Sequence, residues 1–257
     1  MSALLELQDI TIRFGGLTAV DEVNISIDSG TIRALIGPNG AGKSTIFNIV
    51  TGIYSPTSGK VLFNGEDITG TEPYMITQKG IARTFQNIRL FGKMTVLENV
   101  KIGQHCRTKS DFLSAVTGII NPVVKKEEKE IEENSLQALE IVELADKRYE
   151  YAQNLSYGEQ RRLEIARGLA TNPSLLLLDE PAAGMNPLEK QTLMKMIRKI
   201  QDMNLTIFLV EHDMKFVMNL SDRIAVLDYG RKIATGSPEE IQKDPDVIAA
   251  YLGKDVD

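Results

Sequence analysis

The stretch Gly37-Pro38-Asn39-Gly40-Ala41-Gly42-Lys43-Ser44-Thr45 decides how the rest of this chain is interpreted. It follows the apolar run 31–36 and precedes the helix-like run 46–50, so it predicts a loop between a strand and a helix. In a G-x-x-x-x-G-K-[ST] spacing, backbone N–H groups and the positive end of a helix dipole surround phosphate oxygens. Lys43 would supply a positive charge and Ser44 a hydroxyl for Mg²⁺. The strand-loop-helix context argues against a chance glycine-rich turn, but kinases, GTPases and transport ATPases all share this loop.

Composition limits the function further. The 257 residues have a net charge of -6, so no clustered basic surface indicates a nucleic-acid partner. Cys106 cannot form an internal disulfide, and His105 and His212 are too few for a histidine-rich metal site. No apolar run reaches about 18 residues, and the chain shows no signal-peptide pattern at its start. We therefore expect a chain from a reducing, cytoplasmic compartment that neither spans a membrane nor is secreted.

The first 90 residues predict short strands separated by turns. Partial alternation of Val23, Ile25 and Ile27 favours half-buried antiparallel strands ahead of the strand that feeds the loop. Asn64-Gly65 is a hairpin signal, and we expect the strand before it to pair locally. The predicted elements are strands at 4–14, 23–27, 31–36, 60–63 and 81–85 and a short helix at 73–79.

The middle third predicts a separate helical lobe, with helices at 95–100 and 125–144. The charge run 125–130 is interpreted as a solvated helix face. The segment 112–120 is too short to span a bilayer, and either ordinary core or packing against a partner explains its apolar pattern.

The apolar run 174–180 ends in two carboxylates, Asp179 and Glu180, and is typical of a strand buried on both faces of a parallel sheet. Further predicted elements alternate between strand and helix, so the fold class is α/β and the phosphate loop and the carboxylates should share one sheet edge. These elements are helices at 188–203 and 213–220, a strand at 206–210, a hairpin at 224–235 with its turn at Tyr229-Gly230, and one final helix from Ser237.

The two carboxylates suit ATP hydrolysis. An acid at the carboxyl end of a strand, here Asp179, commonly holds Mg²⁺ through water, and Glu180, pointing the other way in a strand, could orient or deprotonate a water. A solvated acidic turn is the alternative, although four preceding leucines argue for burial. His212 follows a strand and could contact a γ-phosphate, or it could be a capping or core histidine, whereas His105 lies in an unremarkable polar loop.

Together these patterns resemble one family, the nucleotide-binding subunits of ABC transporters, over 4–251. The decisive motif is Leu155-Ser156-Tyr157-Gly158-Glu159, which resembles the family signature Leu-Ser-Gly-Gly-Gln and opens a helix. Further matches follow the family's order: Phe14 where adenine stacks, Gln86 at the Q-loop, Asp179 and Glu180 at Walker B and its following base, and His212 at the switch position.

The resemblance implies one ABC-type ATPase domain over 1–257. Its phosphate-loop core has a mainly parallel sheet and an N-terminal antiparallel β lobe, from 1–90 and 171–257, and 91–170 form an inserted helical subdomain. ATP and Mg²⁺ are implied as cofactors. Implied roles are nucleotide contacts for Phe14 and 37–45, metal binding for Ser44, Gln86 and Asp179, catalysis for Glu180, His212 and Gln86, and contacts of 155–159 to the nucleotide of a second subunit.

The implied partners are a second ATP-binding subunit, identical or related, two integral membrane permease subunits and, indirectly, a periplasmic or extracellular solute-binding protein. No nucleic acid is implied, and the expected location is cytoplasmic, peripheral on the inner face of the cell membrane. The resemblance also implies that two cassettes dimerise head to tail. The physical argument agrees, because a helix N-terminus at Ser156 is an anion site that reaches a second nucleotide only across an interface.

Three residues depart from the family pattern: Tyr157, Glu159 and Asn186. Tyr157 and Asn186 resemble the branched-chain amino-acid subfamily, as do 83–87, 90–99 and an insertion at about 105–125. Glu159 fits less well. Its carboxylate could oppose closure of the dimer near a phosphate, or it could face outward and cap its own helix.

The resemblance therefore predicts an ATP-hydrolysing subunit of an importer for leucine, isoleucine and valine, with urea, short amides or other amino acids as alternative solutes. A soluble ABC ATPase acting on ribosomes or DNA is a second possibility, which the single cassette and acidic balance disfavour. An inactive nucleotide-binding regulator is a third, disfavoured because Glu180 and His212 are both present.

Overall fold

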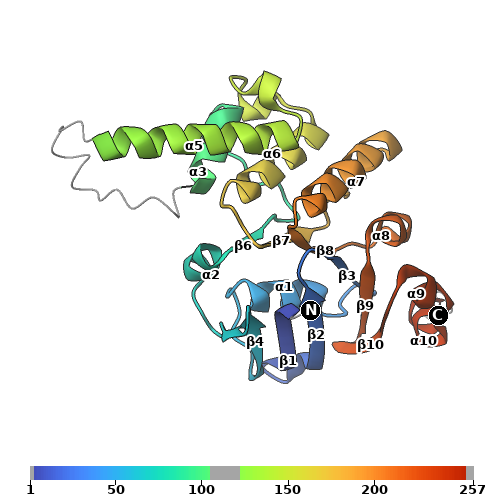
Figure 1. The fold of residues 1–257 in the computed structure, drawn as a ribbon. Coiled ribbons are helices and arrows are strands. Elements are labelled where there is room, and N and C mark those ends of the chain that lie inside the picture. Colours follow the sequence, from blue (N-terminus) through green and yellow to red (C-terminus); the bar gives the residue numbers. More distant parts are fainter. Residues whose placement is uncertain (1–2, 105–121, 253–257) are drawn as a thin grey trace. The chain divides into compact units, whose positions relative to one another are not determined.

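The computed structural model describes residues 3–104 and 122–252, with the side chains of 122–127 and 252 left aside (Figure 1). The expectations for His105, Cys106 and the segment 112–120 lie outside the described residues. Contacts divide the chain into two compact units, one formed by Met1–Gln86 with Ser174–Asp257 and the other by Asn87–Pro173. Each unit is described by itself below.

The first unit contains an antiparallel sheet with the strand order β2-β1-β4-β5. Its strands are β1 (Ala3–Phe14), β2 (Leu17–Asp28), β4 (Ser58–Phe63) and β5 (Glu66–Asp67). The predicted early antiparallel strands are confirmed, and β4 pairs with β5 across the Asn64-Gly65 turn. The expectation of purely local pairing is wrong, because β4 also pairs with β1, with Leu5 opposite Phe63. This long-range pairing buries Val61 and Phe63 in the same core as β1.

The same unit contains a mainly parallel sheet with the order β10-β9-β3-β8-β7-β6, which confirms the predicted fold class. Strand β3 pairs in parallel with β8 and β9, and β7 pairs in parallel with β8 and β6. Only the C-terminal hairpin in this sheet, β9 with β10, is antiparallel among the described strands. The strands are β3 (Ile32–Ile36), β6 (Ile81–Arg83), β7 (Leu175–Asp179), β8 (Thr206–Val210), β9 (Arg223–Asp228) and β10 (Arg231–Gly236).

Every residue of β3, β7 and β8 is buried. This explains the continuous apolar runs in the sequence, since a strand in the middle of a parallel sheet is covered on both faces.

The helices of this unit are α1 (Lys43–Val50), α2 (Pro73–Lys79), α7 (Pro187–Asp202), α8 (Met214–Leu220), α9 (Pro238–Lys243) and α10 (Pro245–Leu252). The predicted bounds of α2 are met, and Gly80 ends it in the left-handed conformation that glycine tolerates.

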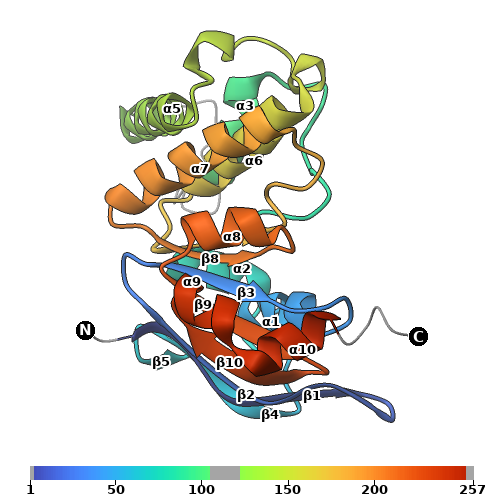
Figure 2. The same ribbon diagram turned by 90° about the vertical axis from the view of Figure 1, so that its right-hand side faces the viewer.

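The C-terminal region differs from the single predicted final helix. Two helices, α9 and α10, lie beside β9 and β10 (Figure 2). Ser237 begins α9 with the predicted capping box, and the helix ends at Lys243. Asp244 is extended, as expected for a residue that precedes proline, and its carboxylate accepts hydrogen bonds from the N–H groups of Asp246 and Val247 at 2.9 and 3.2 Å. The X-Pro step therefore splits the helix.

The second unit is helical, as its sequence predicts. Its described residues, 87–104 and 122–173, include α3 (Val96–Gln104), α5 (Pro122–Ile141), α6 (Tyr157–Leu169) and two short 3-10 turns, Ala145–Lys147 and Ala152–Asn154. These α-helices contact one another in pairs, and Leu139 of α5 and Leu163 of α6 are fully buried. Glu128, Lys129 and Glu130 are exposed, which agrees with a solvated face for the described part of the charge run.

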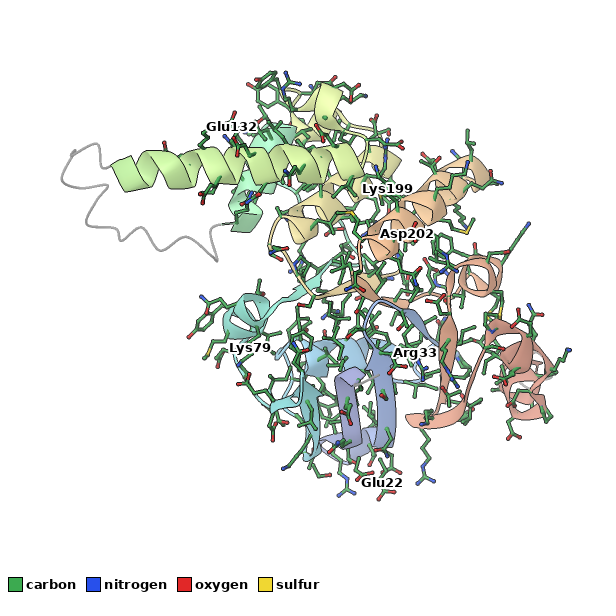
Figure 3. The ribbon with its side chains drawn as sticks, in the orientation of Figure 1. Glu22, Arg33, Lys79, Glu132, Lys199 and Asp202 are labelled. Atoms are coloured by element: carbon green, nitrogen blue, oxygen red, sulfur yellow. The ribbon has the colours of Figure 1, made fainter. Side chains whose placement is uncertain are left out.

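Charged side chains lie mainly on the surfaces of the units. Glu22, Glu132 and Lys199 are exposed, whereas Arg33 is buried and donates a hydrogen bond to Thr235 Oγ1 at 2.7 Å (Figure 3). Burial, reinforced by the nearby charge of Arg223, lowers the pKa of Arg33 to about 10. None of the helices in the described ranges has the length and apolar content needed to cross a bilayer.

Candidate functional site

The phosphate loop joins the carboxyl end of β3 to the start of α1, so the predicted strand-loop-helix order is met. Gly37 and Gly42 have φ angles of 151° and 101°. A Cβ at Gly37 would overlap the carbonyl oxygen of Leu227, and one at Gly42 would lie 2.9 Å from that of Ala19. Glycine is therefore required at both positions. Gly42 is also the N-cap of α1, so no side chain caps the N–H groups at this helix end.

Lys43 is buried and folded back over its own loop. Its Nζ donates hydrogen bonds to the carbonyl oxygens of Gly37 at 2.7 Å and Pro38 at 2.9 Å. A cavity of about 280 Å³ adjoins the loop, and its lining comprises 17–19, 40–45 and 229–230. The loop thus combines uncapped N–H donors, a buried ammonium group and a space beside them, which suits a phosphate group.

Phe14, predicted to stack on adenine, is the last residue of β1 and is 45% exposed. Its ring meets that of Tyr54 edge to face, with the ring centroids 5.3 Å apart. The lining of the loop cavity comes from Leu17, Thr18 and Ala19 rather than from Phe14. Stacking of Phe14 on adenine stays a prediction.

The two adjacent carboxylates occupy different environments. Asp179 is the last residue of β7, is buried, and its Oδ2 lies 2.8 Å from Arg83 Nη2. Glu180 does not continue the strand, as the alternation argument assumed, but has a φ of 46°. Its N–H donates to the carbonyl oxygen of Val210 at 2.9 Å. The left-handed turn, rather than strand alternation, separates the two carboxylates.

Three predicted catalytic residues meet at Glu180. Gln86 Nε2 donates to Glu180 Oε2 at 2.8 Å, and His212 Nδ1 lies 3.6 Å from the same oxygen. The Glu180 side chain is 19% exposed and that of His212 is 60% exposed, so the cluster is open to solvent. The residues come from the segment after β6, the turn after β7 and the segment after β8. Parallel pairing brings these strand ends to one edge of the sheet.

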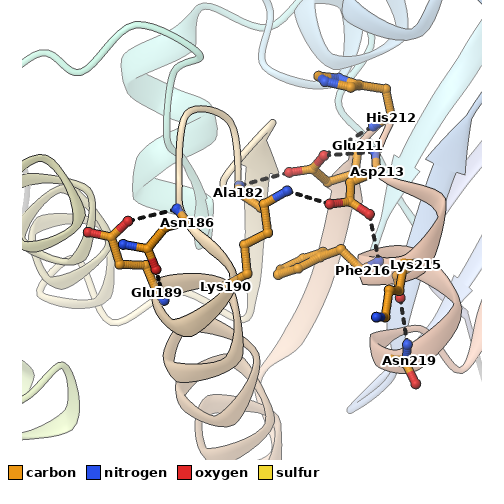
Figure 4. A network of polar contacts seen from close by, with 10 residues as sticks. All are labelled: Ala182, Asn186, Glu189, Lys190, Glu211, His212, Asp213, Lys215, Phe216 and Asn219. Atoms are coloured by element: carbon orange, nitrogen blue, oxygen red, sulfur yellow. Dashed lines mark hydrogen bonds and ion pairs between the residues drawn. The ribbon is translucent and has the colours of Figure 1, made fainter.

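Glu211 was missed by the sequence reasoning, although a charged residue directly between the buried Val210 and His212 is a visible signal. Its side chain is buried and accepts hydrogen bonds from the backbone N–H groups of Ala182, His212 and Asp213 at 2.8, 3.1 and 3.3 Å (Figure 4). Burial raises the pKa of Glu211, although these N–H donors oppose the increase. Glu211 therefore ties the turn after β7 to the segment that carries His212.

Asp213 and Asn186 cap the two helices that follow β8 and β7 (Figure 4). Asp213 caps α8 by accepting from the N–H of Phe216 at 3.0 Å, and it forms an ion pair with Lys190 of α7. The hydrogen bond from Lys190 lowers the pKa of Asp213 below its usual value. Asn186 caps α7 by accepting from the N–H groups of Leu188 and Glu189 at 2.9 and 3.0 Å. A capping role thus accounts for asparagine at this position.

The signature motif belongs to the second unit, where Ser156 is the N-cap of α6. The N–H of Ser156 donates to Glu159 Oε2 at 3.0 Å, and the N–H of Glu159 donates to Ser156 Oγ at 3.4 Å. Glu159 Oε1 also lies 2.8 Å from Lys147 Nζ, and this hydrogen bond lowers the pKa of Glu159. Of the two outcomes foreseen for Glu159, the structure shows the capping one. Tyr157 Oη accepts a long hydrogen bond of 3.4 Å from Arg161.

The ABC transporter family matches residues 20–183, the region from β2 through the phosphate loop and signature to the turn after β7. The chain belongs to the ABC transporter family. A second family, described as branched-chain amino acid ATP-binding cassette transporter, matches residues 231–257. Within the ABC family, this chain is thus grouped with the branched-chain cassettes, as the sequence predicts.

Curated relatives agree with this grouping. The chain is 46% identical over 252 residues to a Pseudomonas aeruginosa protein named high-affinity branched-chain amino acid transport ATP-binding protein BraF, with 98% of each chain covered. The Escherichia coli protein of the same description, LivG, is 45% identical with the same coverage.

Solved ABC cassettes share the fold. A crystal structure described as the ADP conformation of an ATP-binding cassette of an ABC transporter has a TM-score of 0.86 and 34% identity, covering 98% of this chain and 100% of that one. A dimeric cassette described as a post-hydrolysis state bound to ADP and Pi has a TM-score of 0.74 and 25% identity, covering 91% and 98%.

Burial of Glu211 predicts a pH effect on the stability of this ABC cassette. Because folding favours the protonated carboxyl, the free energy of unfolding should fall as the pH rises from the usual glutamate pKa of about 4.3 through the raised one. Glu211→Gln cannot titrate, so its stability should fall less over this range. Urea unfolding at several pH values measures the effect, with the exposed Glu128→Gln as control. Equal pH slopes for Glu211→Gln and the unsubstituted chain would contradict the assignment.

Proposed function

We propose that this chain binds and hydrolyses ATP as a subunit of an ABC importer for branched-chain amino acids. The observation that carries the hydrolytic part is the contact of Gln86 and His212 with one carboxylate oxygen of Glu180. The transport part is supported by whole-length similarity to cassettes named for branched-chain amino acid transport. The family match at 231–257 supports the same solute class.

ATP binding uses the phosphate loop, residues 37–45. Lys43 turns from the carbonyl oxygens of Gly37 and Pro38 to the β- and γ-phosphates, which replace them as stronger, charged acceptors. The uncapped N–H groups at the start of α1 face the same anion. Phe14 stacks on the adenine as its exposed ring permits.

The residues assigned to Mg²⁺ suit this ion. Ser44, Asp179 and Gln86 offer a hydroxyl, a carboxylate and an amide oxygen, which are hard donors, and Mg²⁺ in ATPases is held by few protein oxygens together with phosphate. When bound, the ion supplies charge neutralisation at the phosphate oxygens. Asp179 is suited to hold it because the carboxylate is already fixed by its neighbours.

Glu180 acts as the general base. Gln86 and His212 flank its carboxylate, so a water between these groups can be oriented and its proton accepted by Glu180. His212 is largely exposed at this edge and contacts the γ-phosphate. Glu211 fixes the backbone of His212 by accepting a hydrogen bond from its N–H.

A second cassette completes each site. Residues 155–159 of one copy contact the nucleotide on the phosphate loop of the other. The donor at Ser156 is its hydroxyl, which accepts from the N–H of Glu159 and keeps its own hydrogen to donate. The dimeric relative bound to ADP and Pi supports a dimer of cassettes. Two membrane permeases and an external solute-binding protein complete the transporter, and the cassette lies peripherally on the cytoplasmic face of the membrane.

Glu180→Gln should bind ATP but hydrolyse it at least about 100-fold more slowly, because a general base contributes on the order of 10²- to 10⁴-fold to a rate. Steady-state phosphate release and fluorescent-nucleotide binding measure the two properties. Glu72→Gln, an exposed glutamate whose side chain makes no capping hydrogen bond to its helix, serves as the matched control. Turnover equal to that of the control would remove Glu180 from the base role.

The importer assignment predicts that the chain, isolated gently from its own cells, co-purifies with polytopic membrane proteins. Mass spectrometry of the detergent extract identifies them, and leucine uptake by cells lacking the chain measures the solute class. Association with ribosomes or DNA, and unimpaired leucine uptake without the chain, would contradict the importer assignment.

A further inference from the structure

Arg83 forms a buried ion pair with the carboxylate assigned to Mg²⁺. Its Nη2 lies 2.8 Å from Asp179 Oδ2, and the two side chains are only 9% and 8% exposed. The pair joins the end of β6 to the end of β7, which are parallel neighbours in the sheet. Sequence reasoning placed Arg83 in a subfamily motif but gave it no role.

Arg83 is also anchored to the helix that the phosphate loop begins. Its Nη1 donates to Asn48 Oδ1 at 2.7 Å and to Thr51 Oγ1 at 3.2 Å. The guanidinium carbon lies 5.6 Å from the ring centre of Phe47, also on α1, and 5.2 Å from that of Phe85. Arg83 thus connects β6, α1 and β7.

This arrangement is not explained by stability alone. A buried ion pair loses much of its Coulomb energy to desolvation, so an apolar pair of similar size would often hold the strands as well. An arginine fork, in contrast, fixes the direction of two acceptors at once, since its N–H donors are held in one plane. Here those acceptors are the carboxylate of Asp179 and the amide oxygen of Asn48. The ion pair is made through Oδ2 of Asp179 and does not involve Oδ1, the other carboxylate oxygen.

We propose that Arg83 is a positioning residue for the metal site: it holds the Asp179 carboxylate in a fixed place relative to α1, whose first turn carries Ser44. This inference rests on the proposed function. In this role Arg83 acts through Asp179, its ion-pair partner, and not on the nucleotide or the metal directly. The two oxygen donors, one from β7 and one from α1, thereby keep a constant separation before ATP arrives, so that less reorganisation is needed when the metal binds.

The test measures the affinity of the whole chain for ATP twice, once with Mg²⁺ and once with EDTA, and takes the ratio as the gain due to the metal. Arg83→Gln and Arg83→Lys should reduce this gain roughly 10- to 100-fold, the usual effect of losing a group that orients a metal ligand. Lysine should not rescue it, because a single ammonium cannot bind both acceptors in the same way. Affinity in EDTA should stay within about twofold of that of the unsubstituted chain, because the phosphate loop is intact.

The matched control is Arg231→Gln, which breaks the exposed ion pair with Asp21 and should leave both affinities unchanged. Should the Arg83 variants fold poorly, Asn48→Ala removes one anchor while keeping the ion pair, and it should reduce the metal gain by a smaller factor. A merely structural role would instead lower the melting temperature and both affinities together.

The proposal would be overturned if the metal gain of the Arg83 variants were unchanged, including the case in which ATP affinity falls equally with and without Mg²⁺. A larger gain, as expected if Arg83 competes with the metal for Asp179, would also overturn it. If the unsubstituted chain showed no ATP binding under either condition, the proposed function would fall and the inference with it. Metal-dependent binding that is insensitive to Arg83 and Asn48 would overturn only the inference.

Discussion

Parallel pairing on both sides of β8 is the constraint on which the candidate site depends. Val210, the last residue of β8, lies opposite Leu35 of β3 on one side and Asp179 of β7 on the other. With neighbouring strands about 4.8 Å apart, the ends of β3 and β7 are held roughly 10 Å from each other. The same edge of the sheet therefore carries the phosphate loop after β3, the carboxylates at the end of β7 and the His212 segment after β8.

The apolar core on both faces of these strands makes that register costly to change, since a shift would disrupt the packing of their buried leucine and isoleucine side chains. Polar groups at the edge are held by specific partners rather than by solvent. Lys43 bonds to loop carbonyls, Asp179 to Arg83, and Glu211 to backbone N–H groups. Buried charges need such partners because an unpaired one is strongly disfavoured. These partners order the edge, and under the proposed function ATP exchanges the carbonyl partners of Lys43 for phosphate oxygens.

Local sequence signals predicted much of this arrangement. The loop at 37–45, the helix that Gly80 ends, the Asn64-Gly65 turn and the buried leucine strand each follow from residues close in sequence. Contacts between distant residues carried no such signal: the pairing of β4 with β1 and the Arg83–Asp179 ion pair join separate segments. The position of Glu211 after a buried strand was visible in the sequence, but its backbone partner Ala182 was not. The left-handed turn at Glu180 was also missed, because alternation assumes that a strand continues. Pro245 did mark the break between α9 and α10, and its effect on Asp244 was overlooked.

Under the proposed function, the loop at 37–45 binds the phosphates of ATP, and Lys43 exchanges carbonyl oxygens for phosphate oxygens as it does so. Isothermal titration of Mg·ATP into the unsubstituted chain and into Lys43→Ala measures this exchange, with melting temperatures recorded to show that both chains are folded. Loss of a charge-assisted hydrogen bond costs about 1.5 to 3 kcal/mol, so the dissociation constant of Lys43→Ala should rise at least about tenfold. Equal dissociation constants for the two chains would contradict the account.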